Sequence, residues 1–80
     1  MLVAREYERI RWRCRRGMLE LDLILSRFAE RHLARLDARQ LASFQALLTY
    51  PDNDLFELVT GRRACDHPQL NGVIELIKAA

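Results

Sequence analysis

Apolar residues recur every three or four positions along most of the chain, which is the spacing of helices that bury one face. No stretch alternates between apolar and polar residues as a half-buried strand would. The helical pattern is interrupted at Gly17, at Tyr50-Pro51 and at Gly61, where glycine or proline favours a turn. We therefore predict an all-α fold, a small bundle of about five short helices in which residues 1–80 form a single domain.

Two helices are expected in the first half of the chain. The first runs from about Ala4 to the Arg15-Arg16 pair, and the second from about Met18 to Leu33. The first helix carries an apolar stripe made by Val3, Tyr7, Ile10 and Cys14. The second helix has an inward face made by Met18, Leu21, Leu25, Phe28, Ala29 and His32.

A third helix is expected to begin after Asp37. Asp37 and Gln40 are three residues apart, the spacing of a capping box in which each side chain bonds to the other residue's backbone. The helix should end at Thr49-Tyr50-Pro51, because the residue before a proline is biased away from helical angles.

Two shorter helices complete the prediction. Asp52 or Asp54 is expected to cap a helix that stops before Gly61, and Asp66 to cap a last helix that begins near Pro68. The inward face of the last helix is formed by Leu70, Val73, Ile74 and Ile77.

The chain is too short for a large enclosed pocket, since 80 residues make one domain with a thin core. It contains no nucleophile elbow and no phosphate-binding glycine loop. Glu20 and Asp22 are two residues apart, so on a helix their side chains diverge and do not form a close catalytic pair. These observations favour a binding or assembly protein over an enzyme.

The metal-binding residue types are few and scattered. Cys14, Cys65, His32 and His67 have none of the paired spacings of a zinc site, so we predict no metal site. Cys14 falls on the apolar stripe and should be buried, whereas Cys65 is expected in a loop as a free thiol.

Charge is distributed unevenly along the chain. The first 17 residues contain six arginines and two glutamates, a net charge of +4, and the remaining residues carry a net charge of −2. A basic N-terminal face suits an acidic partner, a phosphate or a nucleic acid, and it equally suits an ordinary solvated helix. An arginine-rich start resembles a mitochondrial transit peptide, but Glu6 and Glu8 argue against one, and we expect a mature cytoplasmic chain.

Several large apolar residues lie off the buried stripes. Trp12 is spaced with Arg9 and Arg16 on the side of the first helix that faces away from Ile10. We interpret Trp12 as an interface residue; the alternative is a ring that covers a neighbouring helix. Leu19 and Leu23 are expected to pack under a terminal helix, and the alternative is that they extend a binding surface.

The most informative stretch is Arg15-Arg16-Gly17-Met18-Leu19-Glu20-Leu21-Asp22. Gly17 permits unusual backbone angles and close approach of another chain. Arg16 and Glu20 are four residues apart, so on a continuous helix they would lie side by side and could form an ion pair. Preceded by Ile10-Arg11-Trp12, this stretch resembles the signature of the small succinate dehydrogenase assembly factors, the flavinator or FAD-attachment family, whose hallmark is an R-G-x-x-E motif. The segment Tyr50-Pro51-Asp52-Asn53-Asp54-Leu55-Phe56 is similar to that family's second, acidic segment, D-x-D-L-[FW].

The resemblance implies a function. Members of this family bind the flavoprotein subunit of succinate dehydrogenase, often also that of fumarate reductase, and promote covalent attachment of FAD to a histidine. FAD is then the cofactor of the client, and the factor itself holds none tightly. The resemblance implies that the partner-binding residues are Arg16, Gly17, Glu20, Asp22, Trp12 and Arg9. The alternatives are an antitoxin-type protein-binding module and a small nucleic-acid-binding protein that uses the basic first helix.

Overall fold

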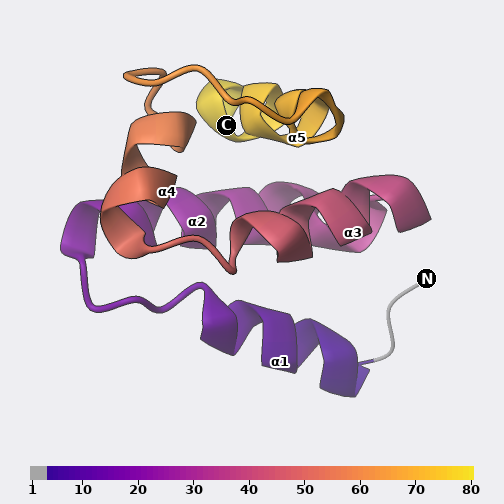
Figure 1. Cartoon of the computed structure of the whole chain (residues 1–80). Helices are drawn as coiled ribbons and strands as arrows, with labels where there is room; N and C mark the ends of the chain where they lie inside the picture. The colour runs from indigo at the N-terminus through magenta and orange to yellow at the C-terminus, as the bar shows by residue number, and fades with distance from the viewer. Residues whose placement is uncertain (1–3) are drawn as a thin grey trace.

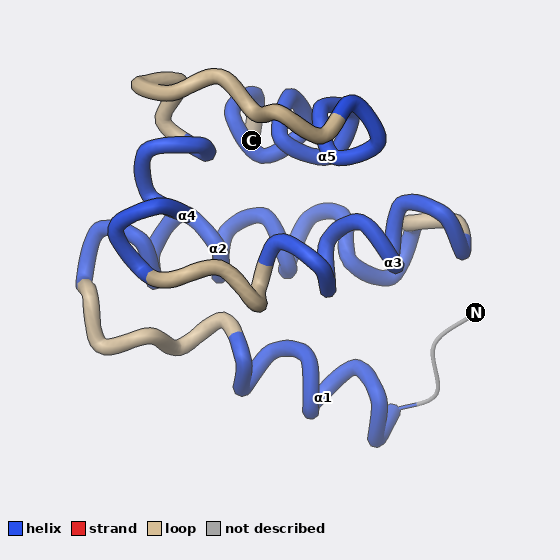
Figure 2. The backbone as a smooth tube through the Cα atoms, in the orientation of Figure 1, coloured by secondary structure: helices blue, strands red, loops and turns tan. Residues whose placement is uncertain are grey.

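The computed structural model describes residues 4–80, which form five α-helices and one short 3-10 helix (Figure 1). These are α1 (Ala4–Arg13), α2 (Leu19–His32), η1 (Leu33–Arg35), α3 (Ala38–Leu47), α4 (Asp52–Val59) and α5 (Pro68–Ala79). The described residues contain no strand (Figure 2), so the predicted all-α class is confirmed. Val3 lies outside the described residues. No helix within residues 4–80 is both long and apolar enough to cross a membrane.

The helices are arranged in three tiers (Figure 1). α1 lies at the bottom of the view, α2 and α3 lie together in the middle, and α5 lies above them. α4 stands at one end and leads from the middle tier to the top one. α5 packs against α2, α3 and α4, so the C-terminal helix covers the face of the middle tier that is turned away from α1.

The core is formed by the apolar faces that the sequence periodicity predicts. Phe28 of α2 and Phe44 of α3 meet at its centre with ring centroids 5.1 Å apart. Other side chains that are almost fully inaccessible to solvent are Leu21, Leu25, Leu33, Leu47, Leu55, Leu58 and Val73. The predicted inward residues of the last helix are all buried, while Tyr7, Met18 and His32 are half-buried at the margin. Burial of these apolar faces is the dominant stabilising contribution to the fold.

The helix starts agree only partly with the prediction. The capping box of α3 is confirmed: the Gln40 N–H donates to Asp37 Oδ1 at 2.7 Å, and the Asp37 N–H donates to Gln40 Oε1 at 3.0 Å. The predicted caps of the next two helices are wrong. Pro51 and His67 occupy the N-cap positions of α4 and α5, and neither provides a side-chain cap.

Asp52 does not cap α4 because it lies in the first turn of that helix. Its carboxylate accepts a hydrogen bond from the Arg16 side chain instead. Asp66 precedes the N-cap of α5 by one residue, too early to cap it. The predicted stop after α4 is confirmed. Gly61 has a φ of +79°, the left-handed conformation in which glycine commonly ends a helix.

The first helix ends earlier than predicted. α1 stops at Arg13, and its last turn tightens as the Cys14 N–H bonds to the Arg11 carbonyl at 3.1 Å. Arg15 and Arg16 therefore belong to the connection to α2 and not to a helix. Within α1 only Ile10 is buried, so the helix is attached to the core by a small apolar contact and by the connection that joins it to α2.

The two cysteines should differ sharply in reactivity. Cys14 is only 1% exposed, and its burial raises the pKa of the thiol to about 11. Because the thiolate is the nucleophile, Cys14 should resist alkylation at pH 8 in the folded protein. Cys65 is half-buried in the α4–α5 connection and should react.

Intact-mass analysis after treatment with iodoacetamide should therefore show one adduct on the folded protein and two adducts in denaturant. The Cys65→Ser variant should show none until it unfolds. Rapid double labelling of the folded wild type would contradict the burial of Cys14.

Candidate functional site

The connection between α1 and α2 is anchored by the side chain of Arg16. Its Nε donates to Asp52 Oδ1 at 2.7 Å, its Nη1 donates to the Leu48 carbonyl at 2.6 Å, and its Nη2 donates to the Tyr50 carbonyl. The side chain is only 15% exposed. A planar guanidinium can satisfy several acceptors at once, and here it joins the α1–α2 connection to the α3–α4 connection.

Asp22 fixes the backbone of the same connection. From the first turn of α2, its two carboxylate oxygens accept the Arg16 N–H at 2.7 Å and the Gly17 N–H at 3.2 Å. A carboxylate near a helix N-terminus is also favoured by the helix dipole. The loop is therefore held in two ways. The Arg16 side chain ties it to the α3–α4 region, and the Asp22 carboxylate binds its backbone N–H groups.

Gly17 lies at the surface of this anchored loop. Its φ is +83°, a conformation that non-glycine residues rarely adopt. A Cβ built on Gly17 would meet no heavy atom within 4 Å, so the space in front of it is open. The glycine is required here by the backbone conformation, and it leaves the main chain accessible to another molecule.

The expected pair of Arg16 and Glu20 does not form. Because the chain between α1 and α2 is not helical, Arg16 turns inward to Asp52, whereas Glu20 is exposed on α2. No ion pair of residues 4–80 includes Glu20. The structure thus brings Arg16, Gly17 and Asp22 together and leaves Glu20 beside them on the surface.

Trp12 is exposed, as predicted for an interface residue. Its side chain is 68% accessible, and the Arg15 guanidinium lies 5.6 Å from the ring centroid. Arg9 is also exposed, but it lines a separate shallow hollow on the α3 side of α1, with Glu6, Ile10 and Gln45. Arg9 is therefore next to the Trp12 surface and not part of the same depression.

The expectation that Leu19 and Leu23 pack under a terminal helix is wrong. Leu19 is 74% exposed and Leu23 is 57% exposed. The C-terminal helix α5 packs on the other side of α2, so nothing within residues 4–80 covers these leucines. Among residues 4–80, these two leucines and Trp12 are the large apolar residues that are exposed. Leu19 and Leu23 line a hollow together with Gly17 of the anchored loop.

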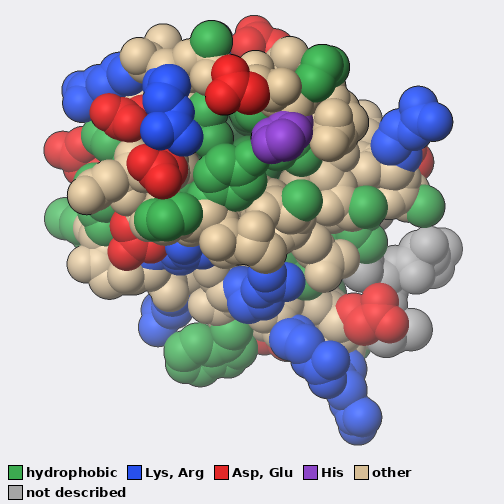
Figure 3. All heavy atoms as spheres, viewed as in Figure 1, with side chains coloured by type: hydrophobic (Ala, Val, Ile, Leu, Met, Phe, Trp, Pro, Cys, Tyr) green, Lys and Arg blue, Asp and Glu red, His purple; other side chains and the backbone are tan. Residues whose placement is uncertain are grey.

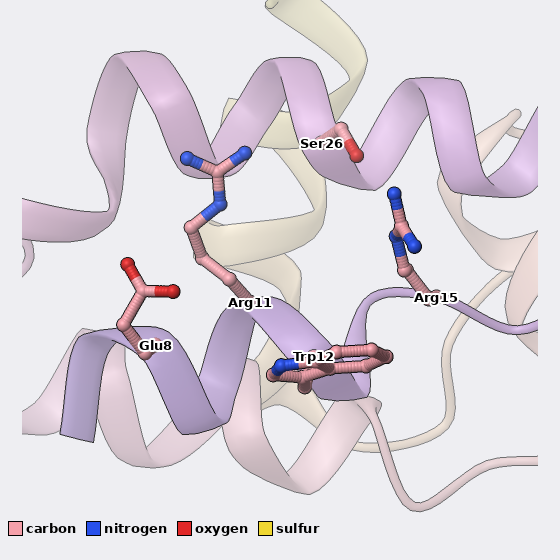
Figure 4. A pocket seen from close by; sticks show the side chains of 5 residues that line it. All are labelled: Glu8, Arg11, Trp12, Arg15 and Ser26. Carbon is pink, nitrogen blue, oxygen red and sulfur yellow. The ribbon is translucent and has the colours of Figure 1, made fainter. Parts of the chain in front are cut away.

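A groove between α1 and α2 was not foreseen from the sequence (Figure 4). Its walls are formed by Glu8, Arg11, Trp12, Arg15 and Ser26. The spacing of Arg11 and Arg15, four residues apart, could have indicated that they share one side. The contribution of Ser26 could not be foreseen, because it depends on how α2 lies against α1.

Within residues 4–80, no three His, Cys, Asp or Glu side chains come together in a way that could hold a metal ion.

Removing the carboxylate of Asp22 should loosen the loop without dismantling the core. In Asp22→Ala the Arg16 and Gly17 N–H groups lose their acceptor, which should lower the free energy of unfolding by about 1–2 kcal/mol. Asp22→Asn retains one acceptor oxygen and should lose less. Urea denaturation followed by circular dichroism measures both; equal stability of Asp22→Ala and wild type would contradict the anchoring role.

Comparison with known proteins assigns the chain to a family. The family model described as flavinator of succinate dehydrogenase matches residues 8–80, nearly the whole chain. The chain belongs to this family. No solved structure gives a significant match.

Several bacterial relatives of this flavinator family member are named FAD assembly factor SdhE. The Vibrio cholerae protein is 39% identical over 79 residues, which cover 99% of this chain and 92% of that protein. The Legionella pneumophila (strain Lens) protein is 41% identical over 76 residues, with 78% and 96% coverage, respectively. The Colwellia psychrerythraea protein is 38% identical over 69 residues, with 86% and 76% coverage.

In this member of the flavinator family, the two segments that resemble the family are in direct contact. Arg16 from the first segment and Asp52 from the second are 36 positions apart and form the ion pair that anchors the loop. The acidic segment therefore supports the loop that presents Gly17, and the two segments form one structural unit.

Proposed function

We propose that this chain is an assembly factor that binds the flavoprotein subunit of succinate dehydrogenase and promotes the covalent attachment of FAD. The observation that carries the proposal is the match of the flavinator family model to residues 8–80. The relatives named as FAD assembly factors support it. We extend the proposal to the flavoprotein of fumarate reductase, and we place the step in the bacterial cytoplasm with residues 1–80 acting as one domain.

The factor contributes positioning and not chemistry. The bond between flavin and histidine forms within the flavoprotein, and FAD remains that subunit's cofactor while the factor holds none tightly. A protein that stabilises the geometry in which the reacting atoms are aligned can raise the rate considerably. This role requires an accessible, rigid surface, which the anchored loop around Gly17 supplies.

The predicted partner-binding residues divide into two groups. Gly17, Glu20 and Trp12 are exposed and are proposed to contact the flavoprotein, with Arg9 at the border of the contact. Arg16 and Asp22 are proposed to act indirectly, because their polar groups are engaged in holding the loop.

A nucleic acid suits this surface less well. Figure 3 shows Lys and Arg side chains along the lower edge, where α1 lies, and most acidic side chains higher on the same face. However, Glu6 and Glu8 are exposed on α1 itself and interrupt the positive surface. A nucleic-acid partner would require a continuous set of phosphate contacts.

The test measures covalent flavin directly. The apo flavoprotein subunit and FAD are incubated with and without this chain, and in-gel flavin fluorescence after denaturation reports the bound flavin. We expect clearly faster labelling with the chain present. Equal rates with and without it would overturn the proposed function for that client, and an antitoxin-type role would then be tested by capture of a toxin partner.

A further inference from the structure

The groove between α1 and α2 continues into a second hollow along α2. The first part, with a volume of about 310 Å³, is lined by Glu8, Arg11, Trp12, Arg15 and Ser26. The second part, with a volume of about 460 Å³, is lined by Arg15, Gly17, Leu19, Asp22, Leu23 and Ser26. Because Arg15 and Ser26 line both parts, the two hollows adjoin, and Gly17 lines the second of them. We call them together the α1–α2 groove.

The first part of the groove has the chemistry of an anion site. In Figure 4 the side chains of Arg11 and Arg15 both reach toward α2, and the hydroxyl of Ser26 points into the space beside Arg15. Arg11 lies 3.8 Å from a Glu30 carboxylate oxygen, and both side chains are well exposed, so this pair is weak. Arg15 forms no ion pair within residues 4–80, and its guanidinium lies over the Trp12 ring. Both guanidinium groups can therefore donate hydrogen bonds to an external anion.

The second part of the groove is apolar at its rim. Leu19 and Leu23, which line it, are more than half exposed. Trp12, also exposed, lines the first part of the groove. Tryptophan is enriched at the energetic centres of protein interfaces, and exposed apolar surface that is gathered in one place marks an interaction site more often than single scattered residues do.

We propose that the α1–α2 groove receives an acidic side chain of the client flavoprotein, from a segment that also carries apolar residues. The carboxylate lies between Arg11 and Arg15, where charge-assisted hydrogen bonds orient it. The neighbouring apolar residues cover Leu19, Leu23 and Trp12. This inference rests on the proposed function and specifies which feature of the client is recognised.

The lining of the groove favours a carboxylate over a phosphate. Glu8 stands at the end of the groove beside Arg11, so two positive side chains are accompanied by one negative one (Figure 4). In the first part of the groove this leaves one excess positive charge, which matches a single negative charge. Asp22, in the second part, already accepts the backbone N–H groups of Arg16 and Gly17. A doubly charged phosphate would be repelled by Glu8 and would gain nothing from the apolar rim.

The test compares charge reversals inside and outside the groove. Binding of the full chain to the apo flavoprotein subunit is measured by isothermal titration calorimetry for wild type, Arg11→Glu and Arg15→Glu. Arg39→Glu is the matched control, since Arg39 is exposed on α3 and does not line the groove. We expect the Kd to rise roughly tenfold or more for each groove variant and to change less than about twofold for Arg39→Glu.

A charge exchange then identifies the acidic residue of the client. A photo-crosslinking amino acid in place of Ser26 marks the flavoprotein segment that enters the groove. Replacing an acidic residue of that segment by lysine should restore part of the binding to Arg15→Glu. Circular dichroism checks that each variant is folded, and Arg15→Gln serves as a milder variant if the reversal unfolds the chain.

The outcomes separate this inference from the proposed function. If wild type binds the flavoprotein and both groove variants bind equally well, the groove inference is wrong while the proposed function stands. An equal loss in Arg39→Glu would assign the effect to net charge and would also overturn the inference. Binding of FAD alone or inorganic phosphate that disappears in Arg15→Glu would assign the groove to a phosphate ligand. If wild type neither binds nor accelerates labelling, the proposed function itself fails.

Discussion

Replacement of Gly17 by arginine should abolish the acceleration of FAD attachment and leave a folded helical protein. The backbone angle at Gly17 costs a non-glycine residue about 1–2 kcal/mol, but a Cβ at this position would meet no heavy atom within 4 Å. The arginine would instead stand in the open space in front of the loop, where Gly17 lines the α1–α2 groove. A partner that approaches the Gly17 backbone would then be excluded.

The matched control for Gly17→Arg is Gly61→Arg. Gly61 has nearly the same backbone angle, a φ of +79°, so the substitution introduces a similar strain and the same charge. Its Cβ would meet only the flexible end of Lys78, at 3.3 Å, and it lies in the α4–α5 connection, outside the groove. In-gel flavin fluorescence should be lost for Gly17→Arg and retained for Gly61→Arg. If Gly17→Arg unfolds in circular dichroism while Gly61→Arg does not, Gly17 has a structural role instead.

The fold could be predicted because its determinants are local. The apolar spacing of α2 and α5 defines one buried face in each, and the structure buries Leu21, Leu25, Val73 and Ile77 as that spacing requires. The start of α3 was equally predictable, since both partners of a capping box lie within one turn of each other. Such contacts depend little on the rest of the molecule.

The end of α1 could not be predicted because its cause is distant in the sequence. A run of arginines continues through Arg15 and Arg16, but the Arg16 side chain bonds to acceptors near position 50, and its backbone N–H bonds to Asp22. The same contact explains why Asp52 is not a cap. The contact between Arg16 and Asp52 thus contributes to both errors, and local patterns do not indicate it because the two residues are 36 positions apart.

The surface posed a different difficulty. Leucine is a common core residue, so Leu19 and Leu23 could be expected to be buried. Their spacing does not distinguish a leucine that another helix covers from one that stays exposed at the surface. They are exposed because α5, the C-terminal helix, packs on the opposite side of α2. If the proposed binding function holds, this error is expected, because sequence patterns for a folded core fail at surfaces kept for a partner.

The R-G-x-x-E segment contains one residue that anchors the loop and two residues that are exposed at the surface. Arg16 points into the molecule, Gly17 faces out of it, and Glu20 extends the exposed side onto α2. A substitution at either kind of position can reduce activity, but through different measurable routes. Substitutions of Arg16 should lower stability first, whereas substitutions of the exposed Glu20 should lower binding at unchanged stability.

Replacement of Arg16 by alanine should therefore be the most destabilising surface-region change in this chain. It leaves Asp52 and the carbonyls of Leu48 and Tyr50 without their shared donor, and the guanidinium that holds them is only 15% exposed. Loss of hydrogen bonds from a charged donor should lower the free energy of unfolding by about 2–3 kcal/mol. Urea denaturation followed by circular dichroism measures this change, and flavin labelling should fall in parallel as the loop at Gly17 loses its support.

The conservative variant and a neighbouring control distinguish geometry from charge. Arg16→Lys keeps the positive charge but lacks the planar fork that reaches three acceptors, so it should recover less than half of the lost stability. Arg15→Ala removes the adjacent, exposed arginine and should change the stability by less than about 0.5 kcal/mol. Removing an anchoring side chain should lower the stability of the protein. If Arg16→Ala is as stable as wild type but no longer binds the flavoprotein, Arg16 is therefore a contact residue and not an anchor.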